Sequence, residues 1–530
     1  MMRHATVLDA FADSLARAPE QTAIRIVAGA GEEEALSYEA LYREASRAAA
    51  GLAARGLRRG DRFLGALPTS REFFAVYFGA LFSGVVPIVV AAPRPERPNR
   101  PSVPYAPPLD QLAQVAGARW IVGKSWPPAP QFSVLQCVTA HELCESDGAP
   151  LPLTADPHAI AHLQATSGST RTPRLAIVRH RNIAANVDAI GRAIRHRDGD
   201  VLVTWLPFFH DMGIIGISYA LGWQCPLVAS DPATFVRNQL SWLRTISRHR
   251  GTLSPAPNSA YEVCARVAAR RAVEDLDLSS WRVALCGAEP VRRSTLARFI
   301  EAFGRHGFRP ETMLPVYGLA EATLAVTIPD PDALYGVDEN EGVVSVGSAV
   351  PGHEVRIVDR EARPLPERQV GEIEVRGPSV IDGYWGEGDG ELKREDGFLR
   401  TGDLGYLSGG ELYVTGRIKD IIIIGGRNIS PVQVEALVEP IVGGGIAGGV
   451  AACGVPDPHS QTEMLHVLVE SESVPRADAA AVEEHARAVL AEAYGISGVT
   501  IHWLPRGSIA RTTSGKIQRY RCREWVESAR

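Results

Sequence analysis

Residues 164–174, Gln-Ala-Thr-Ser-Gly-Ser-Thr-Arg-Thr-Pro-Arg, form the stretch around which the rest of the chain is organised. The stretch is rich in small and hydroxylated residues, includes two arginines, and follows an apolar segment, residues 159–163, that is typical of a strand. Such a loop offers backbone N–H groups and hydroxyls to an anion, and glycine lets the backbone approach closely. The stretch therefore predicts a binding site for nucleotide phosphates, with a plain Ser/Thr/Gly surface loop as the alternative.

Five further motifs follow in a fixed order, at residues 205–213, 317–323, 401–405, 416–420 and 514–517. Together with the first stretch they resemble the adenylate-forming superfamily, which contains acyl-CoA ligases, fatty acyl-AMP ligases and peptide-synthetase adenylation domains. The resemblance covers most of the chain. It implies an α/β fold with a large N-terminal body of helix-covered sheets and a β subdomain, plus a small mobile α+β C-terminal lid. We expect the domains to span residues 1–418 and 419–530.

Length, charge and cysteine usage restrict the class of protein. A chain of 530 residues exceeds what one hydrophobic core usually holds, so two or more domains are expected. The net charge of −6 gives no basic footprint for nucleic acid. Seven scattered cysteines without a CxxC pair indicate reduced, buried thiols and a cytoplasmic protein.

The N-terminal region shows neither a signal peptide nor a membrane span. Val7, Leu8, Phe11 and Leu15 recur at helical spacing. The apolar run over residues 73–92 is interrupted by glycines and a proline, which favours a buried helix followed by a buried strand.

Alternating strand and helix patterns predict a parallel sheet covered by helices. Residues 93–108 are rich in proline and are expected to form a surface loop. A helix capped by Ser37 is expected to run to about Arg55. Further helices are expected over residues 71–83 and 478–494, the last capped by Asp478. Strands are expected over residues 62–67, 85–90, 201–205, 283–286, 312–315 and 421–424, and short strands of a β subdomain over 354–358, 372–376 and 411–415.

The resemblance assigns the nucleotide site. Tyr317 offers a flat ring for adenine, and the Glu321 carboxylate can hold Mg²⁺ against phosphate oxygens. Asp403 can accept hydrogen bonds from both ribose hydroxyls, with Arg417 as a second ribose contact. The remaining residues implied to bind nucleotide are Thr166, Ser167, Gly168, Ser169, Thr170, Arg174, Gly287, Ala288, Glu289, Gly318 and Thr323.

The same resemblance assigns catalytic and mobile residues. Lys516 would bridge the substrate carboxylate and the α-phosphate as charge develops. Lys419 stands at the hinge position, where residues absorb backbone rotation. The turn formed by Gly425, Gly426 and Arg427 would border the tunnel for the pantetheine arm of CoA. His210 resembles the residue that lines the carboxylate pocket, although a core histidine paired with its neighbour Asp211 is an equal alternative.

Two features depart from the family pattern. The family's phosphate loop usually continues Gly-x-Pro-Lys-Gly, whereas this chain has Arg171, Arg174 and Leu175 at the glycine, lysine and glycine positions. We expect the added side chains to disturb the triphosphate, so adenylation is the half-reaction in doubt. The segment over residues 323–346 is shorter than in ligases that load carrier proteins, which favours CoA as the acceptor.

The sequence thus predicts an acyl-CoA ligase that joins a carboxylic acid to CoA through an acyl-adenylate, with ATP and CoA as substrates and Mg²⁺ as cofactor. Weak adenylation would make acyl-AMP from a partner enzyme its main substrate. One alternative is a fatty acyl-AMP ligase that loads an acyl carrier protein. Another is a non-catalytic protein that binds acyl-adenylates.

Overall fold

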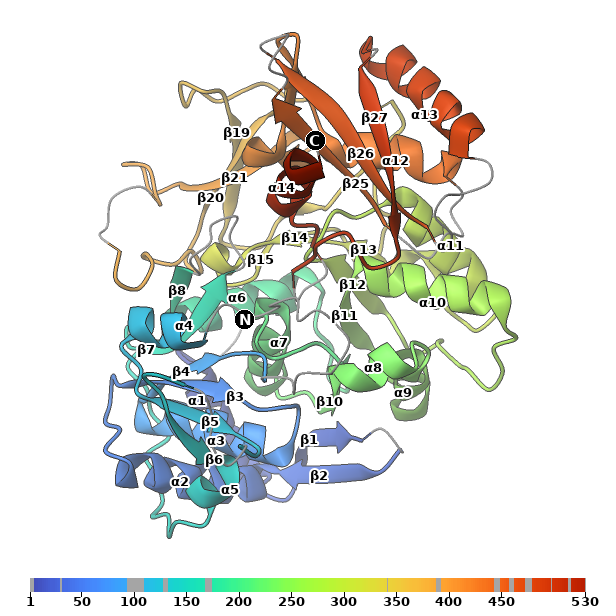
Figure 1. Ribbon diagram of the computed structural model, residues 1–530. Helices are drawn as coiled ribbons and strands as arrows, with labels where there is room; N and C mark the ends of the chain where they lie inside the picture. The colour runs from blue at the N-terminus through green and yellow to red at the C-terminus, as the bar shows by residue number, and fades with distance from the viewer. Residues whose placement is uncertain are drawn as a thin grey trace.

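The computed structural model describes residues 4–28, 31–92, 109–126, 132–166, 174–340, 342–387, 392–442, 449–456, 462–471, 479–496, 498–512 and 516–529. Residues before Lys419 are called the body and residues 419–530 the C-terminal part. Figure 1 shows the C-terminal part, orange to red, above the blue-to-green portion of the body. The expected loop over residues 93–108 and the expected cap Asp478 lie outside the described residues.

A seven-stranded sheet forms the centre of the body, in the order β13-β12-β11-β9-β10-β1-β2. Its strands run parallel, except that β2 pairs antiparallel with β1. The inner strands are buried, as expected of a parallel sheet covered on both faces. The bounds are β1 Thr22–Val27, β2 Glu33–Ser37, β9 Leu202–Thr204, β10 Leu227–Ser230, β11 Leu253–Pro257, β12 Val283–Gly287 and β13 Met313–Pro315.

A second, four-stranded parallel sheet has the order β4-β3-β5-β6. Helix α3 between β3 and β4 is buried almost all round, which accounts for the long apolar run in the sequence. Gly84 ends this helix with a φ of 72°, a left-handed conformation that suits glycine. The strands are β3 Arg62–Ala66, β4 Val86–Val89, β5 Trp120–Gly123 and β6 Gln136–Thr139.

Helices pack around these sheets (Figure 1). Ser37 caps α2 by accepting a hydrogen bond from the Ala40 N–H, as the sequence predicts. The helices of the body are α1 Val7–Arg17, α2 Tyr38–Ala54, α3 Arg71–Ser83, α4 Leu109–Ala116, α5 Ala140–Cys144, α6 His180–Ala193, α7 Asp211–Gly222, α8 Pro232–Arg237, α9 Ser241–His249, α10 Asn258–Arg270 and α11 Arg293–Gly304, with short 3-10 turns η1 Pro310–Thr312 and η2 Ala320–Ala322.

The rest of the body is antiparallel. Strands β7 and β8 form a hairpin, and β19 to β22 form a four-stranded meander, the predicted β subdomain. The bounds are β7 Ile160–Thr166, β8 Arg174–Arg179, β14 Tyr317–Gly318, β15 Ala325–Ile328, β16 Val337–Asp338, β17 Val343–Val344, β18 Ser348–Ala349, β19 Glu354–Val358, β20 Gly371–Arg376, β21 Leu399–Ser408 and β22 Glu411–Arg417.

The C-terminal part has its own sheet, β25-β26-β27, with α12 and α13 against one face and α14 against the other. Among the described residues, the two hydrophobic clusters on these faces contain nothing before Ile422. The bounds are η3 Ile418–Asp420, β23 Ile422–Ile424, β24 Arg427–Ile429, α12 Pro431–Ile441, β25 Val450–Pro456, β26 Glu463–Ser471, α13 Ala479–Tyr494, β27 Val499–Pro505 and α14 Arg519–Ala529.

The predicted elements within the described residues are confirmed, with ends shifted by up to three residues. None of the described helices has the length and apolar character that crossing a bilayer requires.

Candidate functional site

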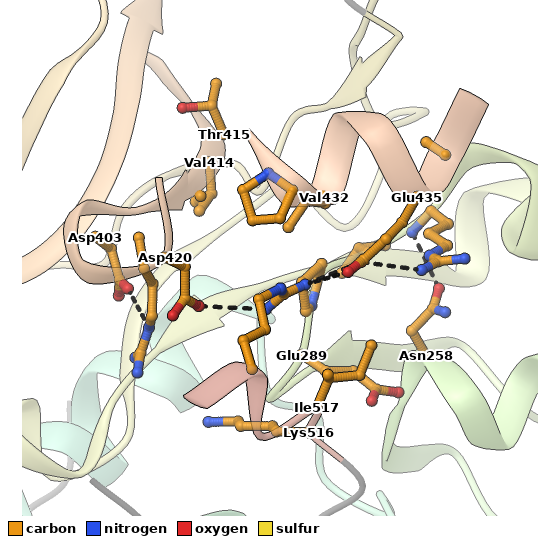
Figure 2. Close-up of a pocket in the computed structure, with 18 of the residues that line it drawn as sticks. Asn258, Glu289, Asp403, Val414, Thr415, Asp420, Val432, Glu435, Lys516 and Ile517 are labelled. Carbon is orange, nitrogen blue, oxygen red and sulfur yellow. Dashed lines mark hydrogen bonds and ion pairs between the residues drawn. The ribbon is translucent and has the colours of Figure 1, made fainter. Parts of the chain in front are cut away.

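A cleft of about 1770 Å³ is lined by residues of both the body and the C-terminal part. It brings together Tyr317, Glu321, Asp403, Arg417 and Lys516, which the sequence singled out from four separate motifs. Figure 2 shows Asp403 and Lys516 on the walls of this cleft.

Asp403 is the organising carboxylate, and it is only 5% exposed. It lies on β21 directly opposite Arg417 of β22, so strand register places the two side chains together. Arg417 Nε donates to Asp403 Oδ1 at 2.7 Å, and the Tyr317 hydroxyl donates to Oδ2 at 2.8 Å. The Asp403 carboxylate raises the pKa of Arg417, and burial, followed by Asp403, raises the pKa of Tyr317 well above its usual value. Both neighbours therefore stay protonated as donors.

Tight backbone contacts hold the wall around Tyr317. A Cβ added at Gly318 would lie 1.9 Å from the carbonyl oxygen of Leu324, so only glycine fits there. Ala288 follows β12 with a φ of 66° and lines the cleft together with Glu289. The Glu289 carboxylate accepts a hydrogen bond from the Ser259 N–H. Gly287 is the last residue of β12, and it is not among the described residues that line the cleft, whereas its neighbour Ala288 is.

A second group of polar side chains surrounds Glu321. The Tyr384 hydroxyl donates to Glu321 Oε1 at 2.5 Å. Arg174 lies over the Tyr384 ring at 3.5 Å from its centroid, and its Nε donates to Glu387 at 2.8 Å. The pKa of Tyr384 is raised by burial and then by Glu321, and Arg174 lowers the pKa of Glu387. We call this group of lining residues, Arg174, Glu321, Tyr384 and Glu387, the polar end of the cleft.

The hairpin of β7 and β8 positions Arg174 beside Tyr384. Leu175 O accepts a hydrogen bond from the Trp385 N–H at 2.8 Å, and the Ile177 N–H donates to Gly383 O at 3.1 Å. The chain around Tyr384 therefore runs alongside β8. Sequence reasoning missed Tyr384 and Glu387 because they are more than two hundred residues from Arg174 and belong to no motif that we identified.

Leu175 corrects one expectation. Its side chain is fully buried in a hydrophobic cluster with residues of β3, β4 and α4, and it does not line the cleft. Its φ is not positive, so the backbone does not require glycine here. The side chain alternates to the opposite face of β8 from Arg174, since successive strand residues point to opposite faces. Leu175 therefore does not crowd a phosphate. Arg171 and residues 167–170 lie outside the described residues.

Thr323 and Thr166 are also held in structural roles. Thr323 is 1% exposed, and its hydroxyl donates to Ser379 O at 2.6 Å; its assignment to the nucleotide stays a prediction. The Thr166 hydroxyl donates to Arg174 O at 3.3 Å across the hairpin. Neither threonine is among the described residues that line the cleft.

His210 precedes α7 as its N-cap residue, with its ring centroid 4.5 Å from that of Phe209. Gln164 Nε2 donates to the Phe209 carbonyl at 3.0 Å, so β7 fixes the segment that carries His210. The Asp211 carboxylate accepts from the Met212 N–H at 2.7 Å. His210 is not among the described residues that line the cleft.

The C-terminal part presents one side to the cleft. Lys419, in η3, and Lys516 both line it. The Lys516 segment is held by a pair of contacts with Thr512, in which Lys516 N–H donates to the Thr512 hydroxyl at 3.1 Å and Thr512 N–H donates to Lys516 O at 2.7 Å.

The turn of Gly425, Gly426 and Arg427 lies outside the described lining of the cleft. Both glycines have left-handed φ values, 56° and 79°, and nothing lies within 4 Å of a Cβ added at either. Arg427 is exposed and donates to Tyr494 O at 2.6 Å. In this pose Lys516 therefore lines the cleft and the turn does not, although Tyr494, to which Arg427 donates, is a lining residue.

The carboxylate of Glu321 suits a magnesium ion that binds together with a nucleotide. The described residues contain no group of three or more His, Cys, Asp or Glu side chains that could hold a metal alone. Mg²⁺ typically binds one or two carboxylates, substrate phosphates and several waters. A single carboxylate at the polar end of the cleft, Glu321, provides that kind of partial shell.

The environments of the seven cysteine thiols disfavour a role as nucleophile. Five are buried, while Cys137 and Cys144 are half-buried. Burial raises the pKa of every one of them, to about 11 for Cys144 and Cys522 and to about 12 for Cys225 and Cys453. The thiolate needed by a nucleophile is thus disfavoured, as the sequence predicted.

Known proteins match this chain over nearly its whole length. A family model described as AMP-binding enzyme matches residues 11–385. A putative acyl-CoA synthetase of Caulobacter vibrioides is 33% identical over 94% of this chain and 92% of its own. The medium-chain-fatty-acid–[acyl-carrier-protein] ligase JamA of Moorena producens is 34% identical over 93% of this chain and 90% of its own. A solved structure from work on fatty acyl-adenylate ligases of E. coli and L. pneumophila is 32% identical, with a TM-score of 0.86, covering 100% of this chain and 98% of that one.

Proposed function

The chain belongs to the AMP-binding enzyme family, and we propose that it is an acyl-CoA ligase that activates a fatty carboxylic acid as its acyl-adenylate. The observation that carries this proposal is the Asp403 carboxylate, held between Tyr317 and Arg417 in the same cleft as Glu321 and Lys516.

The adenosine of ATP would bind at the Asp403 end of the cleft. Asp403 accepts hydrogen bonds from the ribose hydroxyls, and such bonds to a charged acceptor are strong. Tyr317 offers its ring to adenine beside Ala288 and Glu289. Because Tyr317 and Arg417 already fix the carboxylate, little ordering is left to occur on binding.

Adenylation would take place at the other end. A carboxylate oxygen of the acid attacks the α-phosphorus, the bond from that phosphorus to the bridging oxygen breaks, and pyrophosphate leaves with the electron pair. Lys516 stabilises the charge that develops on the phosphoryl oxygens. Arg174 is the cation placed to contact the departing phosphates. Bound Mg²⁺, held by Glu321 and the nucleotide, would neutralise phosphate charge.

The thiol step requires a second pose of the C-terminal part. We place the boundary after residue 418 and Lys419 at the hinge, which makes residues 419–530 a lid. Rotation would withdraw Lys516 and bring the open Gly425-Gly426 turn to the cleft. The thiol sulfur, after losing its proton to solvent, then attacks the acyl carbon, and AMP departs with the electron pair of the broken bond.

Three observations bear on the acceptor. The short segment over residues 323–346 and the turn with two glycines favour the thin pantetheine arm of CoA. The alternative, an acyl carrier protein, is favoured by the match to JamA, whose name states that acceptor.

The buried position of Leu175 favours retained adenylation over dependence on acyl-AMP from a partner enzyme.

One experiment separates these possibilities. Thioester formation is measured with CoA and with a holo-acyl carrier protein, each from dodecanoate plus ATP and from supplied dodecanoyl-AMP. We expect the CoA thioester from both starting points, at a higher rate than with the carrier protein. A faster reaction with the carrier protein identifies the alternative ligase. AMP binding without any thioester or pyrophosphate release identifies a non-catalytic binding protein.

A further inference from the structure

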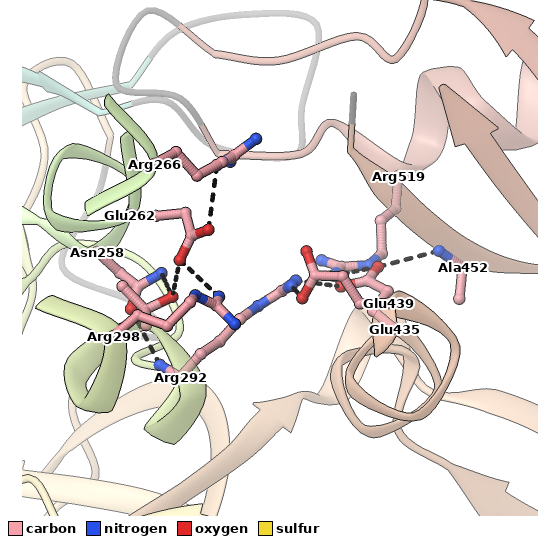
Figure 3. A network of polar contacts seen from close by, with 10 residues as sticks. Asn258, Glu262, Arg266, Arg292, Arg298, Glu435, Glu439, Ala452 and Arg519 are labelled. Carbon is pink, nitrogen blue, oxygen red and sulfur yellow. Dashed lines mark hydrogen bonds and ion pairs between the residues drawn. The ribbon is translucent and has the colours of Figure 1, made fainter. Parts of the chain in front are cut away.

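An ion-pair network crosses from the body to helix α12 of the C-terminal part (Figure 3). Arg292, the residue before α11, pairs through Nη1 with Glu439, and its Nη2 lies 3.7 Å from a carboxylate oxygen of Glu435. The side chain of Arg292 is 20% exposed and that of Glu435 only 2%. The side chain of Glu439 is 34% exposed. A charge as buried as that of Glu435 is tolerated only when paired, whereas fully exposed ion pairs contribute little.

Glu435 links Arg292 to the segment that carries Lys516. Its carboxylate accepts two hydrogen bonds from Arg519, at 2.8 and 2.9 Å, and one from the Ala452 N–H at 2.9 Å. Arg519 begins α14 shortly after Lys516, and it also pairs with Asp420 of η3 at 3.2 Å. One buried carboxylate therefore connects the body, the proposed hinge and the segment of Lys516.

Only part of this network can survive a rotation of the lid. Glu435, Arg519 and Ala452 all belong to the lid and would move together. Arg292 stays with the body, where its backbone N–H donates to Asn258 Oδ1 at 3.0 Å. The contacts of Arg292 with Glu435 and Glu439 would be lost, and contacts made in one pose alone are those that bias a two-state equilibrium.

We infer that Arg292 and Glu439 form a latch that favours the pose in which Lys516 lines the cleft. The inference rests on the proposed function, and it makes both residues positioning residues for adenylate formation. Their effect reaches the chemistry through Glu435 and Arg519. Release of the latch lowers the fraction of molecules with Lys516 in place, so adenylation slows while ATP still binds the body.

Charge exchange tests the latch. In acid-dependent ATP–pyrophosphate exchange with dodecanoate, Arg292→Glu and Glu439→Arg are each expected to lower kcat about tenfold without changing the KM for ATP. The double variant re-forms the pair between positions 292 and 439 with reversed polarity but not the contact with Glu435, so it is expected to recover part of the lost kcat. Arg293→Glu is the matched control, because Arg293 pairs at 2.6 Å with Glu339 of the body itself.

A second readout needs no catalysis. Spin labels at Val236→Cys on the body, where the side chain is 70% exposed, and at Glu484→Cys on α13 report the distance between body and lid. The background carries Cys137→Ser and Cys144→Ser, which removes the two thiols that are not buried. Without ligand, Arg292→Glu should broaden the distance distribution, whereas Arg293→Glu should leave it unchanged. Arg292→Gln repeats both measurements if the charge reversal prevents folding.

An unchanged distribution in the Arg292 variant overturns the latch. A double variant as slow as the single variants, beside a normal Arg293 control, overturns it as well. If the unmodified protein exchanges no pyrophosphate but the labels respond as expected, the proposed function fails while the latch stands.

Discussion

The two ends of the cleft are built differently. At the Asp403 end, a carboxylate that is 5% exposed is fixed by strand register and two donors. At the Arg174 end, the ion pair with Glu387 has side chains that are 41% and 43% exposed, and it depends on stacking over Tyr384. A buried, paired group tolerates little change, whereas an exposed one can adjust to its ligand. If these are the nucleoside and phosphate ends of the cleft, as we propose, the nucleoside end is preformed and the phosphate end is adaptable.

The largest effect is expected at the phosphate end, from a residue that the lid supplies. Lys516→Ala should lower adenylation about 10²- to 10³-fold, the usual cost of removing a preorganised transition-state contact. Conversion of supplied acyl-AMP to thioester should be spared, because that step does not use Lys516 in the proposed mechanism. Pyrophosphate exchange and thioester formation are measured on one preparation, with the exposed Lys124→Ala as control. An equal loss of both activities would contradict the assignment.

The second largest effect is expected at Leu175, which lies beside the phosphate end of the cleft but takes no part in its chemistry. Leu175→Ala should lower the free energy of unfolding by about 3 kcal/mol, because it opens a cavity in a packed cluster. The KM for ATP should stay within about twofold, since the side chain faces away from the cleft. Urea unfolding and exchange kinetics check the two parts. Leu334→Ala, at a site that is 62% exposed, should change neither quantity. A stable variant with a lower KM for ATP would restore the view that Leu175 obstructs the phosphates.

Asp403→Ala should remove the acceptor that holds Tyr317 and Arg417 at the proposed nucleoside end. Binding of AMP should weaken by about 2 kcal/mol, the scale of hydrogen bonds to a charged group. Calorimetry measures the affinity, and thermal unfolding shows whether the fold is retained. Asp330→Ala, which removes a surface partner of Arg195, should leave AMP affinity unchanged. An unaltered affinity in the Asp403 variant would show that the ribose does not bind there.

Acid should weaken the hairpin that carries Arg174. Burial lowers the pKa of His162 on β7 to about 3 and that of His180 at the start of α6 to about 4. The unfolded chain takes up these protons near pH 6.5, so the folded state loses stability as the pH falls below 6.5. Each histidine should account for about 2 kcal/mol by pH 5.

Urea unfolding at pH 7.5 and pH 5 measures this loss. His162→Leu should remove the contribution of His162 to this loss of unfolding free energy. The Nδ1 atom of His162 is buried without a hydrogen bond, so the substitution breaks no bond of that atom. The exposed His485→Leu should leave the pH dependence as it is. A pH dependence that His162→Leu does not reduce would refute this origin.

The smallest effect tests how adaptable the phosphate end is. Arg174→Lys keeps the charge but loses the planar contact with Glu387 and the stack on Tyr384. Since the pair is exposed, the KM for ATP should rise by less than about threefold. A loss comparable with that of Lys516→Ala would show that the guanidinium geometry is essential.

The sequence predicts the elements well where local patterns decide them, as in α2 with its Ser37 cap and in the all-round apolar α3. It also brings Asp403 and Arg417 into one site through their motifs. It fails where tertiary packing decides the outcome. Nothing local distinguishes Leu175, which enters the core, from Arg174, which enters the cleft. The contacts of Tyr384 with Glu321 and Arg174 depend on the path of residues 383–385 beside β8.

The most direct test of the proposed function is acid-dependent ATP–pyrophosphate exchange by the unmodified protein with octanoate, dodecanoate and hexadecanoate. We predict exchange that requires both a fatty acid and Mg²⁺, because the proposed nucleoside end is preformed and Arg174, Glu321 and Lys516 are available at the proposed phosphate end. Exchange that is absent with every acid, in a folded protein that still binds AMP, would contradict a functional phosphate end.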